Sequence, residues 1–256
     1  MNLLALGVRE FGLELSPDKL QAFEIYYREL RRWNRRANLT ALISPEEVQI
    51  KHFLDSLSIY ELAEFREAIS SGRELRIVDV GTGGGFPGVP IKIVNPQVSL
   101  TLVDSSRKKV QFLEHLIGAL GLRGVEVIWG RAEEVARRGE HREQYDWVLA
   151  RALAEFPVLA EYLIPFCRVG GYVVAYKGPK IFQELEISSE AISALGGKVL
   201  RLHQVQASAL RGSRYLLLIA KESPTPPLYP RRPGIPAKRP LGLKKGKPPL
   251  HSPGSQ

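Results

Sequence analysis

The chain has 256 residues, 44% of them hydrophobic, and a formal net charge of +9. This composition indicates a globular protein, and the single cysteine, Cys167, excludes an intrachain disulfide and a cysteine-rich zinc site. The apolar runs are too short for a membrane span and the first residues lack the basic start of a signal peptide, so we expect a cytoplasmic protein.

Residues 1–72 are predicted to form a helical segment. Apolar side chains recur at helical spacing from residue 20 to residue 30, behind a serine and a proline that would cap the helix. A second helix is predicted to begin near residues 44–47, where a serine and a glutamate have the spacing of a capping box. A third is predicted to run from residue 54 to residue 65.

Two groups of polar residues in this segment have two interpretations each. The run at residues 31–40 places four arginines around Trp33, which suits either a solvated helix face with one buried ring or a surface that faces RNA. His52 and Asp55 lie three residues apart on one predicted helix face. They could contact a base, or they could form a packing pair inside the protein.

The stretch at residues 77–88 organises the rest of the chain. An apolar, β-branched run ends in five glycines within residues 81–88, and an apolar segment follows, which predicts a strand, a tight turn and a helix start. Glycines let a ligand approach the backbone, and a helix start attracts an anion. Gly81 and Gly83 fit the Gly-x-Gly-x-x-Gly fingerprint, but Phe86 stands where a dinucleotide site would have glycine or alanine.

Short apolar strands alternate with helical segments from residue 73 to residue 222. Strands are predicted at 75–80, 99–103, 125–129, 146–150, 171–177, 198–206 and 214–220, and helices near 87–94, 106–120, 131–139, 155–167 and 181–195. The alternation predicts an α/β, Rossmann-like fold with a doubly wound, seven-stranded, mostly parallel sheet and an antiparallel last hairpin. In such a sheet the ligand lies outside the carboxyl ends of the strands, at the switch point beside the first strand.

Charged residues stand at the predicted strand ends. Asp104 follows Gly81 by 23 residues, where an acidic side chain can accept hydrogen bonds from both ribose hydroxyls of an adenosine cofactor, although it could instead cap the next helix. Glu133 follows the third strand and could recognise an adenine edge or favour a helix start. Arg151 and Lys177 end the fourth and fifth strands, and two cations at neighbouring strand ends indicate a site rather than packing alone.

Residues 223–256 differ in composition from the rest of the chain. They contain ten prolines and seven basic residues but no acidic residue, so we expect an extended or disordered tail. Most of the net positive charge lies in this tail, which favours a polyanion partner, and nucleic acid suits a cytoplasmic protein better than an anionic membrane. A tail that only aids solubility is the alternative.

In combination, these segments resemble the small-subunit ribosomal RNA methyltransferase G family, also called glucose-inhibited division protein B. The matching stretches are 38–40, 51–57, 78–88, 104–109, 130–133, 150–152 and 177–178, and residues 229–236 resemble the ending of many members. The resemblance implies a class I, S-adenosylmethionine-dependent methyltransferase domain at 73–222 that methylates N7 of a guanine in 16S ribosomal RNA. We expect a monomer that acts on this RNA or on the small ribosomal subunit.

The resemblance also implies roles for single residues. The family's cofactor-binding positions match Gly81, Phe86, Asp104, Ser105, Ser106, Ala132, Glu133 and Arg151. The first two would line the methionine and ribose side of the cofactor, the next three would hold the ribose, and the alanine and glutamate would frame the adenine. Arg151 would close the site near the transferred methyl group, and we expect Arg151 and Lys177 to position the RNA base.

The chemistry of guanine suits a site without a general base. Guanine N7 has a lone pair in the base plane and carries no proton, so methyl transfer needs alignment and exclusion of water instead. A nicotinamide-dependent dehydrogenase would share the fold, but Phe86, the lack of a second catalytic domain and the basic tail oppose it. A non-catalytic RNA-binding module is opposed by the intact glycine turn together with Asp104.

Overall fold

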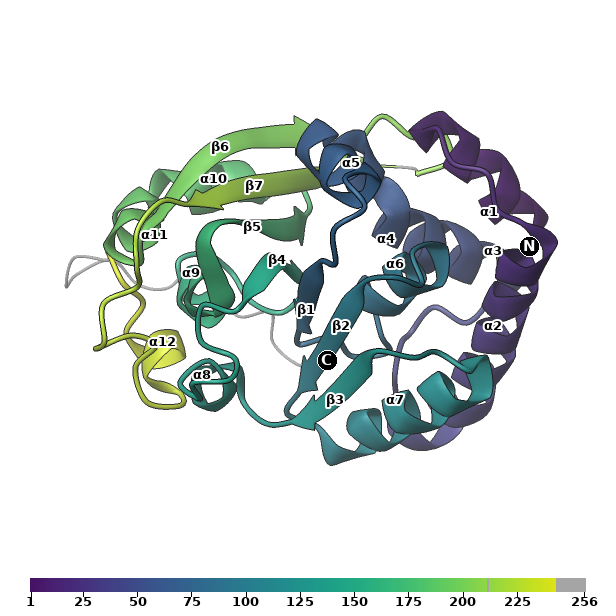
Figure 1. Cartoon of the computed structure of the whole chain (residues 1–256), viewed down its shortest axis with the longest axis horizontal. Helices are drawn as coiled ribbons and strands as arrows, with labels where there is room; N and C mark the ends of the chain where they lie inside the picture. The colour runs from purple at the N-terminus through teal and green to yellow at the C-terminus, as the bar shows by residue number, and fades with distance from the viewer. Residues whose placement is uncertain (211, 243–256) are drawn as a thin grey trace.

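Seven strands form one sheet in the order β3-β2-β1-β4-β5-β7-β6 (Figure 1). The computed structural model describes residues 1–210 and 212–242, and its strands are β1 (Arg76–Val80), β2 (Ser99–Asp104), β3 (Val125–Trp129), β4 (Tyr145–Arg151), β5 (Cys167–Lys177), β6 (Gly197–Gln204) and β7 (Tyr215–Lys221). β1 to β5 pair in parallel, whereas β7 runs antiparallel to both β5 and β6. The predicted mostly parallel sheet with an antiparallel last hairpin is confirmed.

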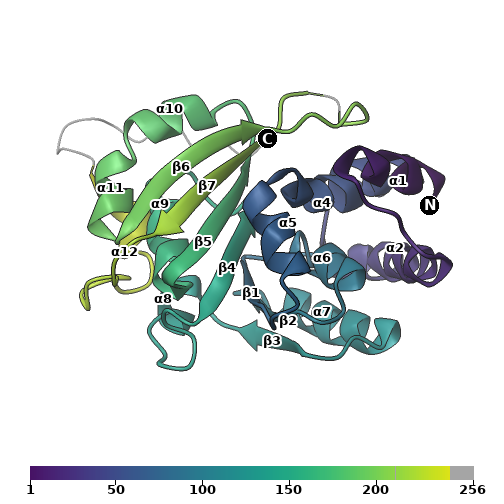
Figure 2. The same ribbon diagram turned by 45° about the horizontal axis from the view of Figure 1, so that its top comes forward.

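Helices cover both faces of the sheet, as Figure 2 shows. One face carries α1 (Asn2–Gly7), α2 (Pro17–Ala37), α3 (Pro45–Glu47), α4 (Asp55–Leu57), α5 (Ala63–Ser70), α6 (Gly88–Val94) and α7 (Arg107–Leu120). The other carries α8 (Ala132–Val135), α9 (Val158–Leu163), α10 (Ile181–Glu186) and α11 (Ser189–Ala194), and α12 (Ile235–Lys238) packs against α9. None of the helices in residues 1–210 and 212–242 has the length and apolar character of a membrane span.

The central strands are apolar on both faces because helices cover both faces. Along β1, Ile77 belongs to the core shared with α2 and α7, whereas its neighbour Val78 belongs to the core shared with α8 and α9. Leu102 and Val103 of β2 divide in the same way. The continuous apolar runs of the sequence therefore correspond to strands buried on both sides.

The amino-terminal helices pack into the same core as the sheet. Phe23 and Leu30 of α2 are buried there, and Phe65 of α5 meets Trp147 of β4 edge to face, with ring centroids 5.0 Å apart. The predicted boundary at residue 72 marks a change from helices to strands, and one core continues across it.

The prediction of a helix at residues 54–65 is wrong. The chain forms a π-helical turn at Val48–Leu54, continues through α4 and a 3-10 turn at Ser58–Glu61, and then breaks at Leu62, whose backbone is extended. Leu62 is fully buried, so packing of this side chain overrides the helical pattern around it. The π-helical turn matters for function because it carries His52 and leads directly to Asp55.

Helices on the second face are shorter than predicted. α8 and α9 have four and six residues, and the single helix predicted at 181–195 is divided into α10 and α11. At this division the Ser188 hydroxyl donates to the backbone oxygen of Glu184. Such local side-chain bonds compete with the helical hydrogen bonds and favour a helix end.

The prediction of an extended or disordered tail is wrong for residues 223–242. This part of the tail lies against the face that carries α8 and α9 (Figure 1), and Thr225 and Pro236 are buried. Prolines lower the entropy cost of ordering a segment because they restrict the unfolded chain. The rest of the predicted tail, residues 243–256, lies outside the described residues.

Candidate functional site

The glycine turn after β1 has a backbone that only glycine fits at two positions. Gly81 has φ +69°, and a Cβ atom there would lie 2.3 Å from the side chain of Leu153. Gly85 has φ +95°, and a Cβ atom there would lie 2.6 Å from the Tyr26 hydroxyl, which donates a 2.5 Å hydrogen bond to the Gly84 oxygen. The absence of a Cβ atom at these positions therefore lets Leu153 and Tyr26 pack directly against the turn.

A first cavity of about 300 Å³ opens at the carboxyl ends of β1, β2 and β3. Its walls include Gly81, Asp104, Ser105, Ala132, Glu133 and Tyr162. It lies beside β1, where the strand order reverses between β1 and β4, which is the place where the sequence predicts the ligand. Its volume suits part or all of a small organic ligand.

Two buried carboxylates face this first cavity. Asp104 accepts hydrogen bonds from the backbone amides of Gly83, at 2.9 Å, and Ser106, at 2.8 Å. Glu133 accepts one through Oε1 from the Gly234 amide, at 2.9 Å. Carboxylate oxygens accept hydrogen bonds from hydroxyl and amino donors, so the pair suits the ribose and base of a nucleoside.

A second cavity of about 370 Å³ adjoins the first, and Ala152 lies in the walls of both. Its walls include His52, Asp55, Arg151, Tyr176, Lys177 and Arg214. These residues come from the π-helical turn, α4 and the ends of β4, β5 and β7. The two cavities therefore meet at Ala152.

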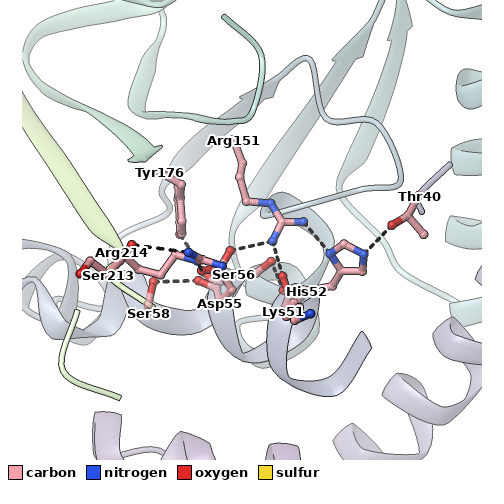
Figure 3. Close-up of polar contacts among 10 residues, drawn as sticks. All are labelled: Thr40, Lys51, His52, Asp55, Ser56, Ser58, Arg151, Tyr176, Ser213 and Arg214. Atoms are coloured by element: carbon pink, nitrogen blue, oxygen red, sulfur yellow. Dashed lines mark hydrogen bonds and ion pairs between the residues drawn. The ribbon is translucent and has the colours of Figure 1, made fainter. Parts of the chain in front are cut away.

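Arg151 is held in place by three groups of the amino-terminal segment (Figure 3). Its Nη1 donates to Asp55 Oδ2 at 2.8 Å and to the Lys51 oxygen at 3.0 Å, and its Nη2 lies 3.1 Å from His52 Nδ1. Its guanidinium also stacks over Phe86, 5.0 Å from the ring centroid. The side chain is thus fixed at the end of β4 with little freedom to move.

The neighbours of His52 define its protonation state. A guanidinium can only donate, so Nδ1 of His52 accepts from Arg151, and Nε2, 2.8 Å from the Thr40 hydroxyl, carries the proton. Burial, with the positive charge of Arg151, lowers the pKa of His52 to about 3. His52 is therefore neutral near pH 7, and both it and Asp55 bind Arg151 rather than each other.

Replacing His52 by glutamine is expected to flatten the pH dependence of stability in acid. The pKa of His52 is about 3 in the folded protein and about 6.5 in an unfolded chain. The unfolded state therefore binds the extra proton as the pH falls below 6.5, and stability decreases by up to about 1.4 kcal/mol per pH unit. Urea unfolding of both proteins at pH 7, 6 and 5 measures this term.

The difference in unfolding free energy between wild type and His52→Gln should shrink as the pH falls. Burial raises the pKa of Asp79 to about 7, which gives a slope of opposite sign, since this stability is lost as the pH rises toward 7. That term is present in both proteins and cancels in the difference. A difference that stays constant from pH 7 to pH 5 would contradict the neutral His52.

Asp79 lies under the glycine turn and is fully buried. Its Oδ2 accepts from the Thr82 hydroxyl at 2.7 Å and from the Gly88 amide at 2.8 Å. Its Oδ1 is the one buried side-chain polar atom without a hydrogen-bond partner in the part of the chain that the structure describes. Because its pKa is raised to about 7, much of this carboxyl group is protonated at neutral pH.

The predicted cofactor residues do not all line the first cavity. Gly81, Asp104, Ser105, Ala132 and Glu133 do so. Ser106 instead precedes α7 and contributes its backbone amide to Asp104. Phe86 is stacked between Tyr26 and His52, with ring centroids 5.2 and 4.6 Å away, and so contacts the Arg151 cluster.

Lys177 is paired within the protein. Its Nζ donates to the Ala154 oxygen at 2.8 Å and to Glu184 Oε2 at 2.6 Å, and it stacks over Phe156. Both Lys177 and Arg151 border the second cavity. The pairing of Lys177 with Glu184, which lies in α10, was not predicted.

Sequence reasoning missed Arg214 at the second cavity. Its Nε lies 3.7 Å from Asp55 Oδ1, so Asp55 lies between two guanidinium groups (Figure 3). Arg214 is the residue before β7, an antiparallel strand whose amino-terminal end reaches the edge where β5 has its carboxyl end. Because β7 is antiparallel to β5, the residues before β7 lie at the site together with the residues that end β5. This position follows from the pairing of the two strands and not from the local sequence around Arg214.

Comparisons with known proteins bear on both cavities. A family model described as GidB, rRNA small subunit methyltransferase G, matches residues 19–214. Ribosomal RNA small subunit methyltransferase G of Desulforamulus reducens is 43% identical over 238 residues, which cover 93% of this chain and 97% of that protein. The protein of the same name from Symbiobacterium thermophilum is 45% identical, over 94% of this chain and 97% of its own length. The matched residues include the walls of both cavities named above.

Proposed function

The chain belongs to the rRNA small subunit methyltransferase G family, and we propose that it methylates N7 of a guanine in 16S ribosomal RNA with S-adenosylmethionine as the methyl donor. The observation that carries this proposal is the pair of adjoining cavities. The first has carboxylates suited to a nucleoside, the second has a fixed arginine, and Ala152 lies in the walls of both.

The first cavity fits the nucleoside part of the cofactor. Asp104 would accept hydrogen bonds from the ribose hydroxyls, Ala132 and Glu133 would frame the adenine, and Gly81 would let the backbone approach the methionine part. Bound S-adenosylmethionine supplies a methyl group activated by a positively charged sulfur. The two carboxylates would bind the hydroxyl and amino groups of the cofactor rather than the reacting sulfur.

The second cavity would hold the guanine, and Arg151 would anchor it. Arginine pairs with the O6 atom of guanine or with a phosphate through its planar donors. Asp55, His52 and Phe86 hold the guanidinium in one orientation, so little freedom is lost on binding. N7 carries no proton, so the residues of this cavity have to orient the base and exclude water rather than accept a proton.

Further contacts to the RNA would come from the arginine face of α2, which consists of Arg28, Arg31, Arg32 and Arg35. These exposed residues line a groove of about 290 Å³ with Tyr27. Trp33 packs against α7 through Phe112 and His115, so the ring is used in packing while the arginines face outward. The chain after α2 leads to Thr40, which contacts His52 at the second cavity.

Replacing both Arg31 and Arg35 by glutamine is expected to weaken RNA binding and its dependence on salt. Each lost phosphate contact removes about 0.7 to 0.9 from the slope of log K against log salt concentration, so we expect a change of about 1.4 to 1.8. A Lys198→Gln/Arg201→Gln variant, on the edge strand β6, is the matched control and should keep the wild-type slope. Equal slopes in both variants would contradict the role of the arginine face.

The role of Lys177 as an RNA contact stays a prediction. In the structure its ammonium group is bonded to Ala154 and Glu184, so a phosphate would have to replace those partners. We also propose that the protein acts as a monomer, because one chain builds both cavities, and that it acts in the cytoplasm, where ribosomal RNA is assembled into subunits.

Mass-spectrometric mapping of new methyl groups tests the function. Unmodified 16S RNA and small subunits that lack the modification are incubated with the protein and S-adenosylmethionine. We expect one new methyl group at N7 of one guanine, and comparison of the two substrates identifies the preferred one. Methylation of another atom would overturn the N7 assignment, and tight RNA binding without any methyl incorporation would favour a non-catalytic binding module.

A further inference from the structure

The carboxyl-terminal segment at residues 225–239, here called the strap, is bound to the second face of the sheet by polar contacts. Arg142 donates to the backbone oxygens of Tyr229 and Thr225, both at 2.7 Å. The Thr225 amide donates to Glu143 at 2.7 Å. These contacts fix the path of the strap where it leaves β7.

A second contact joins the strap to α9. The guanidinium of Arg231 binds both carboxylate oxygens of Glu161, at 2.6 to 3.1 Å, and the Arg231 amide donates to the same carboxylate at 2.6 Å. Only 1% of the Glu161 side chain is exposed. Paired donors of this kind hold a carboxylate in one geometry. Tyr162, the residue after Glu161, lies in the wall of the first cavity.

A third contact reaches the first cavity itself. The Gly234 amide donates to Glu133 Oε1 at 2.9 Å, from a left-handed backbone with φ +79°. Arg131 approaches the same oxygen at 3.4 Å, but its side chain is half exposed. Among the described residues no hydrogen bond is made to Oε2 of Glu133. This atom is also not fully buried, since the one buried and unpaired side-chain polar atom of these residues is Oδ1 of Asp79. Oε2 is therefore accessible from the cavity that Glu133 lines.

We propose that the strap is a positioning element of the cofactor site: by binding Glu133 and Glu161 it sets the orientation of the Glu133 carboxylate toward the adenine. This inference rests on the proposed function. α8, which carries Glu133, has four residues, so it offers little rigidity of its own. The strap joins α8 to α9, the helix that also carries Tyr162, and leaves Oε2 of Glu133 to accept a hydrogen bond from the adenine amino group.

The position of Arg231 suits a test because its neighbour provides a matched control. Arg232 is exposed, and its side chain makes no hydrogen bond or ion pair within residues 1–210 and 212–242. Arg231→Ala and Arg232→Ala remove the same atoms from adjacent positions of the full chain. Arg231→Lys keeps a cation opposite Glu161 and serves as the conservative variant if the alanine variant folds poorly, which its melting temperature would reveal.

Binding of two probes to each variant is measured by calorimetry. S-adenosylhomocysteine carries the adenine amino group, and S-inosylhomocysteine has an oxygen in its place. Arg231→Ala should weaken S-adenosylhomocysteine binding about tenfold, as expected for the loss of roughly one hydrogen bond to a charged group, and should reduce the preference over S-inosylhomocysteine by a similar factor. Arg232→Ala should leave both values within twofold, and Arg231→Lys should recover most of the affinity.

A double-mutant cycle distinguishes positioning from general destabilisation. If the strap acts through Glu133, Arg231→Ala should weaken binding less than twofold further in a Glu133→Gln background. In turnover it should raise the KM for S-adenosylmethionine more than it lowers kcat. Equal affinities for Arg231→Ala and Arg232→Ala, or full additivity with Glu133→Gln, would overturn the proposal. Methylation of 16S RNA by the wild type is scored separately, so failure of the proposed function would be recognised on its own.

Discussion

Replacing Arg151 by alanine is expected to lower kcat/KM for methyl transfer to ribosomal RNA by about 100-fold or more. Arg151 stands at the end of β4 in the second cavity and is fixed by Asp55, His52 and the Phe86 ring. A fixed cation there would orient the guanine, and misplacement of a reacting group by about 1 Å can cost about 100-fold in rate. The measurement is single-turnover methylation of unmodified 16S RNA with saturating S-adenosylmethionine.

The control for this variant has to account for Asp55. Without Arg151, the buried carboxylate of Asp55 would retain only Arg214, 3.7 Å away, among its charged partners in residues 1–210 and 212–242, and a buried charge that loses its partner destabilises the protein. An Arg151→Ala/Asp55→Asn double variant removes that charge and should recover stability without recovering activity. Arg201→Ala, at an exposed arginine on β6, should leave turnover unchanged. Wild-type turnover by Arg151→Ala on 16S RNA would contradict the anchoring role.

Binding of S-adenosylhomocysteine separates the two cavities in this experiment. Arg151 borders the second cavity, whereas Asp104 and Glu133 border the first. The affinity of Arg151→Ala for S-adenosylhomocysteine should therefore remain within a few-fold of wild type. A large loss of this affinity would instead place Arg151 in the cofactor site, as the family resemblance also implies.

Local patterns predicted the sheet because each strand carries its own signal. β1 and β2 are apolar runs buried on both faces, and the five glycines after β1 punctuate the chain at the point where it turns. The alternation of strands and helices then leaves few topologies. The helix break at Leu62 was not predicted because no glycine or proline near it signals the end of a helix. The break accompanies burial of the Leu62 side chain, which the sequence pattern does not show.

The contacts within the site depend on pairs of residues far apart in the chain. Asp104 was predicted because a strand end and its distance from Gly81 are visible in the sequence. Arg151 was also predicted from its strand end, but its partners His52 and Asp55 lie about 100 residues earlier, and only tertiary packing brings them together. His52 and Asp55 were expected either to contact a base or to form a packing pair. In the structure both bind Arg151 and orient it at the cavity wall.

The strap shows the limit of composition as a guide to order. Ten prolines and no acidic residue after residue 222 are typical of a disordered tail. The partners that order it, such as Glu161 and Glu133, are buried carboxylates in the preceding domain. A basic, proline-rich segment can thus fold against a domain whose buried carboxylates match its donors.

Replacing Asp104 by alanine is expected to weaken S-adenosylmethionine binding by at least about 100-fold. A carboxylate that accepts two ribose hydroxyls makes two hydrogen bonds to a charged group, each contributing roughly 1.5 kcal/mol or more, and about 3 kcal/mol corresponds to a factor of about 100 in Kd. Part of the loss would come from the glycine turn, because Asp104 also accepts from the Gly83 amide. Equilibrium binding of S-adenosylmethionine and of S-adenosylhomocysteine measures the effect.

Ser106→Ala is the matched control, because the family resemblance implies the same ribose-holding role for Ser106 as for Asp104. The structure places Ser106 at the start of α7, where it donates its backbone amide to Asp104, and alanine keeps that amide. Its side chain is not in the wall of the first cavity, so Ser106→Ala should change the Kd less than threefold. Equal losses of affinity for the two variants would mean that the ribose lies nearer to α7 than the cavity indicates. Unchanged binding by Asp104→Ala would mean that this carboxylate does not contact the cofactor.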